Sequence, residues 1–163
     1  MKIMVFLHGT AIIHATPVGT TREEMVQQSL RRDPAVLDYI NYVSAGRANE
    51  KLAKWQQQGA EISYLSSHEN EDDVKKDRLV LKKYGFPKGI VYFRQREESY
   101  KDVVESVLPD IYIEDDCESI GGAEEMTSTH FSQDTGLKIK TIVVKEFSGI
   151  DNLPDNLEEL KKY

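Results

Sequence analysis

Short apolar segments alternate with helical patterns along most of the chain. Ile3 to Leu7 is a continuous apolar run that ends at Gly9, which is typical of a buried strand. Four later segments have the length and composition of strands, and they are residues 61–65, 90–93, 111–113 and 140–144. Strands that alternate with helices are joined by crossover connections. The pattern therefore predicts an α/β fold with a mainly parallel five-stranded sheet and helices on both of its faces.

Capping residues mark the starts of the predicted helices. Thr21 and Glu24 form a capping box, which opens a helix that runs to about residue 32. Asp33-Pro34 is a second start signal, and the apolar spacing that follows predicts a helix reaching Val43. Further helices are expected over residues 47–58, 70–84 and 99–108, and after Asp155 as an N-cap. The charged residues 69–77 are interpreted as the solvated face of their helix.

The pattern indicates a single domain over residues 1–163, with residues 20–44 as a small helical cap or insertion at one edge. With 39% hydrophobic and 30% charged residues, the composition excludes a disordered chain, and the longest apolar run is too short to span a membrane. The net charge of −7, without a basic patch, argues against a nucleic-acid partner. The single cysteine, Cys117, fits a reducing cytoplasm.

Polar side chains follow three of the predicted strands. In open parallel sheets, ligands bind beyond the carboxyl ends of the strands. The candidate residues at this edge are His8, Gly9 and Thr10, then Ser66 and Ser67, then Glu114, Asp115 and Asp116, with Lys101 on the preceding helix. These groups are of the types that hold a phosphate or a metal ion, and Lys88 or Arg94 offers the same positive charge as Lys101.

The order of these segments resembles the haloacid dehalogenase-like (HAD-like) superfamily. That family has an apolar strand ending in D-x-D-x-T, a second strand ending in Ser or Thr, a later lysine and a strand ending in paired acids. The corresponding segments here are residues 5–10, residues 63–66, Lys101 and residues 110–115. The resemblance implies a three-layer α/β/α Rossmann-like sandwich with the first strand in the centre and a small cap or none. It also implies hydroxyl donors at Thr10 and Ser66 and a magnesium site at Glu114, Asp115 and Asp116.

The sequence departs from the family at the two aspartates of the first strand. Phe6 stands in the place of the nucleophilic aspartate, and His8 in the place of the general acid and base. Phenylalanine cannot attack phosphorus or hold magnesium, whereas histidine can transfer protons near neutral pH. The leading hypothesis is therefore a pseudo-phosphatase that binds a phosphorylated or other anionic small molecule, as a binding or regulatory module.

Two alternatives remain open. The first is a metal-dependent hydrolase of phosphate esters, in which His8 is a base or ligand and a metal-bound water replaces the missing carboxylate. A related possibility is that His8, His68 and Asp115 form a site with two histidines and one carboxylate, which suits zinc or iron. The second alternative is a protein-interaction domain, with Tyr39 and Tyr42 of the insertion as candidate contacts.

Overall fold

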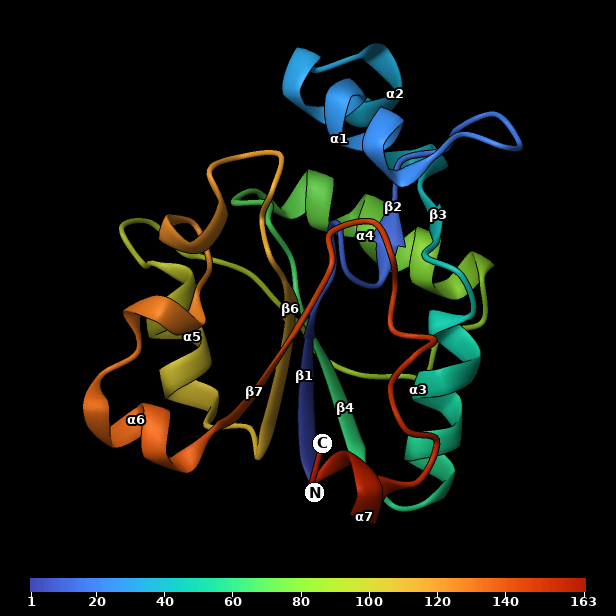
Figure 1. Cartoon of the computed structure of the whole chain (residues 1–163). Helices are drawn as coiled ribbons and strands as arrows, with labels where there is room; N and C mark the ends of the chain where they lie inside the picture. Colours follow the sequence, from blue (N-terminus) through green and yellow to red (C-terminus); the bar gives the residue numbers. More distant parts are fainter.

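The computed structural model describes residues 1–163 and contains one five-stranded parallel sheet (Figure 1). Its strands are β1 (Lys2–Phe6), β4 (Glu61–Leu65), β5 (Val91–Tyr92), β6 (Ile111–Asp115) and β7 (Lys140–Val144). The strand order is β5-β4-β1-β6-β7, and each neighbouring pair is parallel. This confirms the predicted fold class, with the first strand in the centre.

Helices cover both faces of the sheet (Figure 1). On one face, α3 (Ala48–Gln57), α4 (Glu71–Lys83) and α7 (Leu157–Leu160) enclose the larger apolar core. On the other face, α5 (Tyr100–Val107) contributes to a smaller core, and α6 (Gln133–Lys138) lies on the same side. The chain therefore forms a three-layer α/β/α sandwich. None of its helices has the length and apolar composition that a bilayer span requires.

β1 is buried on both faces because its side chains alternate between the two cores. Ile3 and Val5 belong to the larger core and Met4 to the smaller one, and all three are fully buried. A strand with two buried faces needs a continuous apolar sequence, which is why Ile3 to Leu7 shows no polar alternation.

The predicted insertion, residues 20–44, ends in one strand of a short antiparallel pair that the sequence pattern does not reveal. β2 (Ile12–Ile13) pairs antiparallel with β3 (Val43–Ser44), and α1 (Arg22–Arg31), α2 (Pro34–Leu37) and the 3-10 helix η1 (Tyr39–Asn41) lie between them. The predicted helix over residues 34–43 is wrong, since α2 ends at Leu37 and Asp38 leaves the helical conformation. Val43 instead pairs with Ile13, so a partner 30 residues away decides its structure.

α1 begins at the predicted capping box, and a hydrogen bond and an ion pair connect it to the loop that follows β6. The Thr21 hydroxyl accepts a hydrogen bond from the Glu24 amide, and the Glu24 carboxylate accepts one from the Thr21 amide. The hydroxyl of Ser29 lies 2.9 Å from that of Ser119, and Arg22 forms an ion pair with Glu118. The insertion consequently lies over the carboxyl edge of the sheet (Figure 1).

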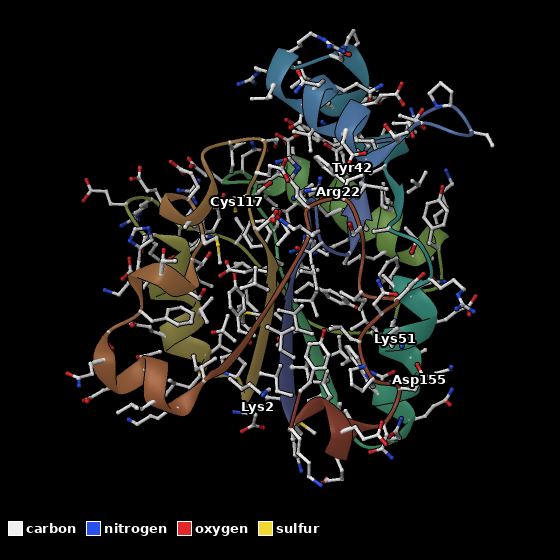
Figure 2. The ribbon with its side chains drawn as sticks, viewed as in Figure 1. Lys2, Arg22, Tyr42, Lys51, Cys117 and Asp155 are labelled. Carbon is white, nitrogen blue, oxygen red and sulfur yellow. The ribbon has the colours of Figure 1, made fainter.

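The cap of the last helix differs from the prediction. Asn156, not Asp155, caps α7, because its side-chain oxygen accepts hydrogen bonds from the first-turn amides of Glu158 and Glu159. Asp155 forms ion pairs with Lys51 and Lys54 of α3 instead (Figure 2).

The sequence pattern also missed α6 and the 3-10 helices η2 (Gly122–Glu124) and η3 (Ser128–His130), whose segments carry few apolar residues.

Two leucines at helical positions test this arrangement of the core. Leu52 in α3 is fully buried, whereas Leu79 in α4 is 55% exposed. We expect Leu52→Ala to lower the free energy of unfolding by about 2–5 kcal/mol, because it leaves a cavity in the larger core. Leu79→Ala should change it by less than about 0.5 kcal/mol. Urea unfolding, followed by the fluorescence of the buried Trp55, measures both, and equal losses would contradict the assigned packing.

Candidate functional site

A cavity of about 210 Å³ lies at the carboxyl edge of the sheet, beneath the insertion. Residues that follow strands β1, β4, β6 and β7 line it, together with side chains of the insertion. Its principal lining residues are Phe6, His8 and Gly9, then Ser67, then Glu114, Asp115 and Cys117, then Glu146 and Phe147, with His14, Ser29 and Tyr42 from the segment between β2 and β3. The cavity therefore occupies the position at which the sequence predicts a ligand site.

Phe6 forms part of the cavity wall. Its ring packs edge-on against the ring of Tyr100, with the ring centres 5.3 Å apart and an interplanar angle of 84°. The ring is partly buried and also contacts the smaller core. Residue 6 is thus directed at the cavity and presents a hydrocarbon side chain to it.

Asp115 is the most strongly perturbed carboxylate that lines the cavity. The Thr10 hydroxyl donates a 2.7 Å hydrogen bond to Asp115 Oδ2, and the Cys117 amide donates one of 3.0 Å to Oδ1. Burial raises the pKa of Asp115 to about 6, the hydrogen bond from Thr10 opposes this shift, and the negative charge of Glu146 adds to it. Asp115 is therefore partly protonated in mildly acidic solution, whereas Thr10 is buried behind it and does not reach the cavity.

Glu146 belongs to the same acidic group, although it was not among the site residues predicted from the sequence. Both its carboxylate oxygens accept 2.7 Å hydrogen bonds from Ser119, one from the amide and one from the hydroxyl. Burial raises its pKa. Oxygens of Asp115, Asp116 and Glu146 all lie within 4.8 Å of one another. Glu146 follows the end of β7, so the strand-end rule that identified the other candidates applies to it as well.

The other two predicted magnesium ligands have protein partners. The backbone amides of Thr127 and Ser128 donate hydrogen bonds of 2.8 and 3.0 Å to the buried carboxylate of Glu114, which fixes the start of η3. Asp116 lies outside the cavity lining and accepts from Lys145 at 2.9 Å. Although burial works against it, this ammonium lowers the pKa of Asp116.

No lysine or arginine lines the cavity. Lys101 is partly buried on α5 but does not reach it, and Lys88 is exposed before β5. Arg94 stacks on the Tyr100 ring at 4.1 Å and pairs with Glu69. The predicted cationic partner of an anion is thus not found at this site.

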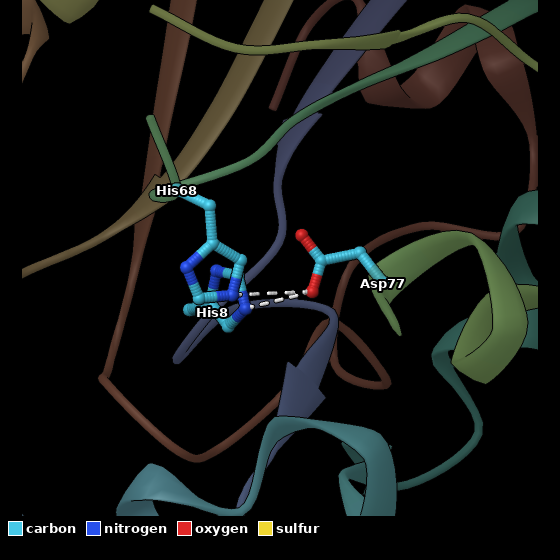
Figure 3. Close-up of side chains that lie close together, drawn as sticks. All are labelled: His8, His68 and Asp77. Carbon is cyan, nitrogen blue, oxygen red and sulfur yellow. Dashed lines mark hydrogen bonds and ion pairs between the residues drawn. The ribbon is translucent and has the colours of Figure 1, made fainter. Parts of the chain in front are cut away.

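His8 belongs to a hydrogen-bonded group beside the acidic one. Its Nε2 lies 3.1 Å from Asp77 Oδ1 (Figure 3). Its Nδ1 lies 2.8 Å from the hydroxyl of Ser67. The Ser66 hydroxyl donates a 2.6 Å hydrogen bond to Asp77 Oδ2, so Ser66 points away from the cavity while Ser67 lines it. This settles which serine faces the site, which the sequence left open.

Asp77 is fully buried, so the interpretation of residues 69–77 as a solvated face is wrong for this residue. The buried residues of α4 are Val74, Asp77, Val80 and Leu81, which fall at helical spacing on one face. An acid flanked at i−3 and i+4 by buried apolar residues was the available signal. Asp77, rather than Asp115, is also the carboxylate nearest to the two histidines.

Comparison with known proteins supports the fold alone. No family model matches the sequence, and no curated protein matches it either. The chain is similar to a chain in the solved structure of a Pnkp1/Rnl/Hen1 complex, with a TM-score of 0.55 and 15% sequence identity. The similarity covers 89% of this chain and 46% of the other, so this chain spans about half the length of that protein.

The raised pKa of Asp115 predicts a pH dependence of stability. Between its ordinary pKa of 3.8 and about 6, the folded protein holds a proton that the unfolded chain has lost. The free energy of unfolding should therefore fall as the pH rises through this window. Asp115→Asn should reduce that fall by about 3 kcal/mol.

Urea unfolding at several pH values between about 4 and 7 measures the effect. Asp134→Asn, on the exposed side of α6, is the matched control and should follow the wild-type pH profile. Identical profiles for Asp115→Asn and the wild type would contradict the assignment.

Proposed function

We propose that this chain is a HAD-like domain without phosphoaspartyl phosphatase chemistry, which acts as a ligand-binding or regulatory module. The observation that carries the proposal is the Phe6 ring on the cavity wall, at the position of the family's nucleophile. A benzyl group has no lone pair with which to form an acyl phosphate. The position of β1 between β4 and β6 supports the resemblance, because it brings the matching strand ends to one edge.

The charge of the cavity restricts the class of ligand. Asp115 and Glu146 line it without a compensating lysine or arginine, so a phosphate alone would be repelled. Magnesium is commonly held by one or two carboxylates together with phosphate oxygens of the ligand. The ligand class that fits is therefore a phosphorylated small molecule bound as its magnesium complex.

The residues present fit magnesium at Asp115. A Cβ atom built on Gly9 would lie 2.7 Å from Asp115 Oδ2, so glycine at this position leaves the space beside the oxygen free. Asp115 and Glu146 would supply hard oxygen ligands, and the ion would neutralise the phosphate. The aromatic side chains of Phe6, Tyr100 and Phe147 would contact the organic part of the ligand.

A metal-dependent hydrolase that uses His8 is the second candidate. His8 lines the cavity, and the buried carboxylate of Asp77 fixes the orientation of its ring. An imidazole held in this way is suited to general acid and base catalysis. Turnover that requires added metal and is lost in His8→Gln would favour this candidate.

The protein-interaction alternative receives less support from its candidate residues. Tyr42 is buried, and its hydroxyl donates to the Val36 carbonyl at 2.7 Å. Tyr39 is partly buried, and the centre of its ring lies 4.3 Å from the centre of the His68 ring. Both rings therefore pack inside the chain.

The small aromatic phosphate ester p-nitrophenyl phosphate tests the proposed function. We expect it to bind in the presence of magnesium without being hydrolysed, because the carboxylate nucleophile is missing. Without magnesium, the acidic cavity should bind it at least about 10-fold more weakly, a difference of about 1.4 kcal/mol. Asp115→Asn should weaken magnesium-dependent binding by at least the same factor.

Isothermal titration calorimetry measures the binding, and release of p-nitrophenol measures hydrolysis. The control Asp134→Asn should bind like the wild type. Magnesium-dependent hydrolysis that Asp115→Asn abolishes would show that phosphatase chemistry has been retained. Equal affinity with and without magnesium would exclude the proposed form of the ligand.

A further inference from the structure

A second cluster of potential metal ligands lies beside the acidic group. It comprises His8 after β1, His68 after β4 and Asp77 on α4 (Figure 3). The Nε2 atoms of both histidines approach the same oxygen, Asp77 Oδ1, at 3.1 and 3.6 Å. One ligand atom from each of the three residues lies within 4.8 Å of the other two. The loops after β1 and β4 and the helix α4 thus bring two imidazoles and one carboxylate together.

The imidazole of His68 has a polar atom without a partner. His68 is 8% exposed, and its Nε2 makes no hydrogen bond, since 3.6 Å to Asp77 is too long for one. A buried polar atom that lacks a partner destabilises the folded state. The unpartnered His68 Nε2 faces His8 and Asp77. This arrangement indicates that the three residues hold a common ligand and are not simply a hydrogen-bonded part of the core.

We propose that His8, His68 and Asp77 bind a divalent transition metal of the zinc class. In a tetrahedral site with bonds of about 2.0–2.1 Å, neighbouring ligand atoms are about 3.3 Å apart. The distances from Asp77 Oδ1 to the two Nε2 atoms, 3.1 and 3.6 Å, lie on either side of this value. Imidazole nitrogens favour zinc or iron over magnesium, so this site differs in chemistry from the carboxylates around Asp115.

Serine hydroxyls form hydrogen bonds with all three ligand residues. Ser66 donates to Asp77 Oδ2 and accepts a 3.1 Å hydrogen bond from the His68 amide, which fixes both residues relative to each other. The Ser67 hydroxyl lies 2.8 Å from His8 Nδ1. Partners of this kind orient metal-binding side chains, and their loss typically weakens metal affinity by about 10–100-fold.

The hydrogen bonds of His8 define its tautomer in this structure. The Ser67 amide points at His8 Nδ1 from 3.3 Å, so Nδ1 carries the lone pair and Nε2 donates its hydrogen to Asp77. Metal held at Nε2 would require that hydrogen on Nδ1, where the Ser67 hydroxyl at 2.8 Å would accept it, and the Ser67 amide would have to turn away from Nδ1. No proton would be gained or lost in this exchange of tautomers.

Aromatic rings pack against the cluster. The ring of Tyr39 lies 4.3 Å from that of His68, and the cavity reaches the cluster at His8. Three protein ligands leave a further coordination position for water or another small ligand.

Titration of the full, chelator-treated chain with Zn²⁺ and Co²⁺ tests the site. We expect one ion per chain and, for Co²⁺, the intense visible absorption of a tetrahedral complex. His68→Gln should weaken Zn²⁺ binding at least 100-fold, because it removes one of three ligands. Ser67→Ala should weaken it about 10-fold. His130→Gln, an exposed histidine of η3, is the matched control and should bind like the wild type.

Failure to bind either ion would overturn the proposal, as would unchanged affinity in both His68→Gln and Asp77→Asn. If Asp77→Asn does not fold, as circular dichroism would show, His8→Gln takes its place. The test is independent of the proposed function, since it uses no phosphorylated ligand. His68→Gln is expected to affect zinc alone, and Asp115→Asn the magnesium-dependent binding of p-nitrophenyl phosphate alone, so the two proposals can fail separately.

Discussion

Parallel hydrogen bonding of β1 to both of its neighbours is the constraint on which the rest of the structure depends. β1 pairs with β4 over five residue pairs and with β6 over three, and its central residues are fully buried. Parallel pairing aligns the carboxyl ends of all three strands at one edge. The residues that follow these strands therefore meet whatever their distance in sequence, and the insertion between β2 and β3 covers them.

Two groups with different chemistry result at this edge. Around Asp115, carboxylates predominate, and burial together with the neighbouring negative charge of Glu146 raises the pKa of Asp115. Around Asp77, two imidazoles share one carboxylate. Phe6 lies on the wall of the same cavity. Carboxylate oxygens and imidazole nitrogens favour different cations, so the two proposed sites would differ in specificity.

The prediction from sequence succeeded where local pattern and packing agree. The five strands and the helices α1, α3, α4 and α5 were expected near their observed positions, because each combines a regular apolar spacing with clear end signals. It failed at residues 34–43, where a strand of two residues depends on its partner. It also failed at Asp155, because Asn156 forms the cap and the aspartate pairs with two lysines of α3.

The sequence by itself determined the order of strands and helices, the edge of the sheet at which polar groups gather, and the absence of a carboxylate at residue 6. These properties depend on periodicity and residue type, which can be read along the chain. Only the tertiary structure decided which of these groups meet. It placed Asp77 inside the protein beside His8 and His68, and it directed Ser66 away from the cavity and Ser67 toward it. Which side chains become partners depends on strand register and helix rotation. The local spacing of apolar residues can indicate that Asp77 is buried, but it does not encode which residues Asp77 meets.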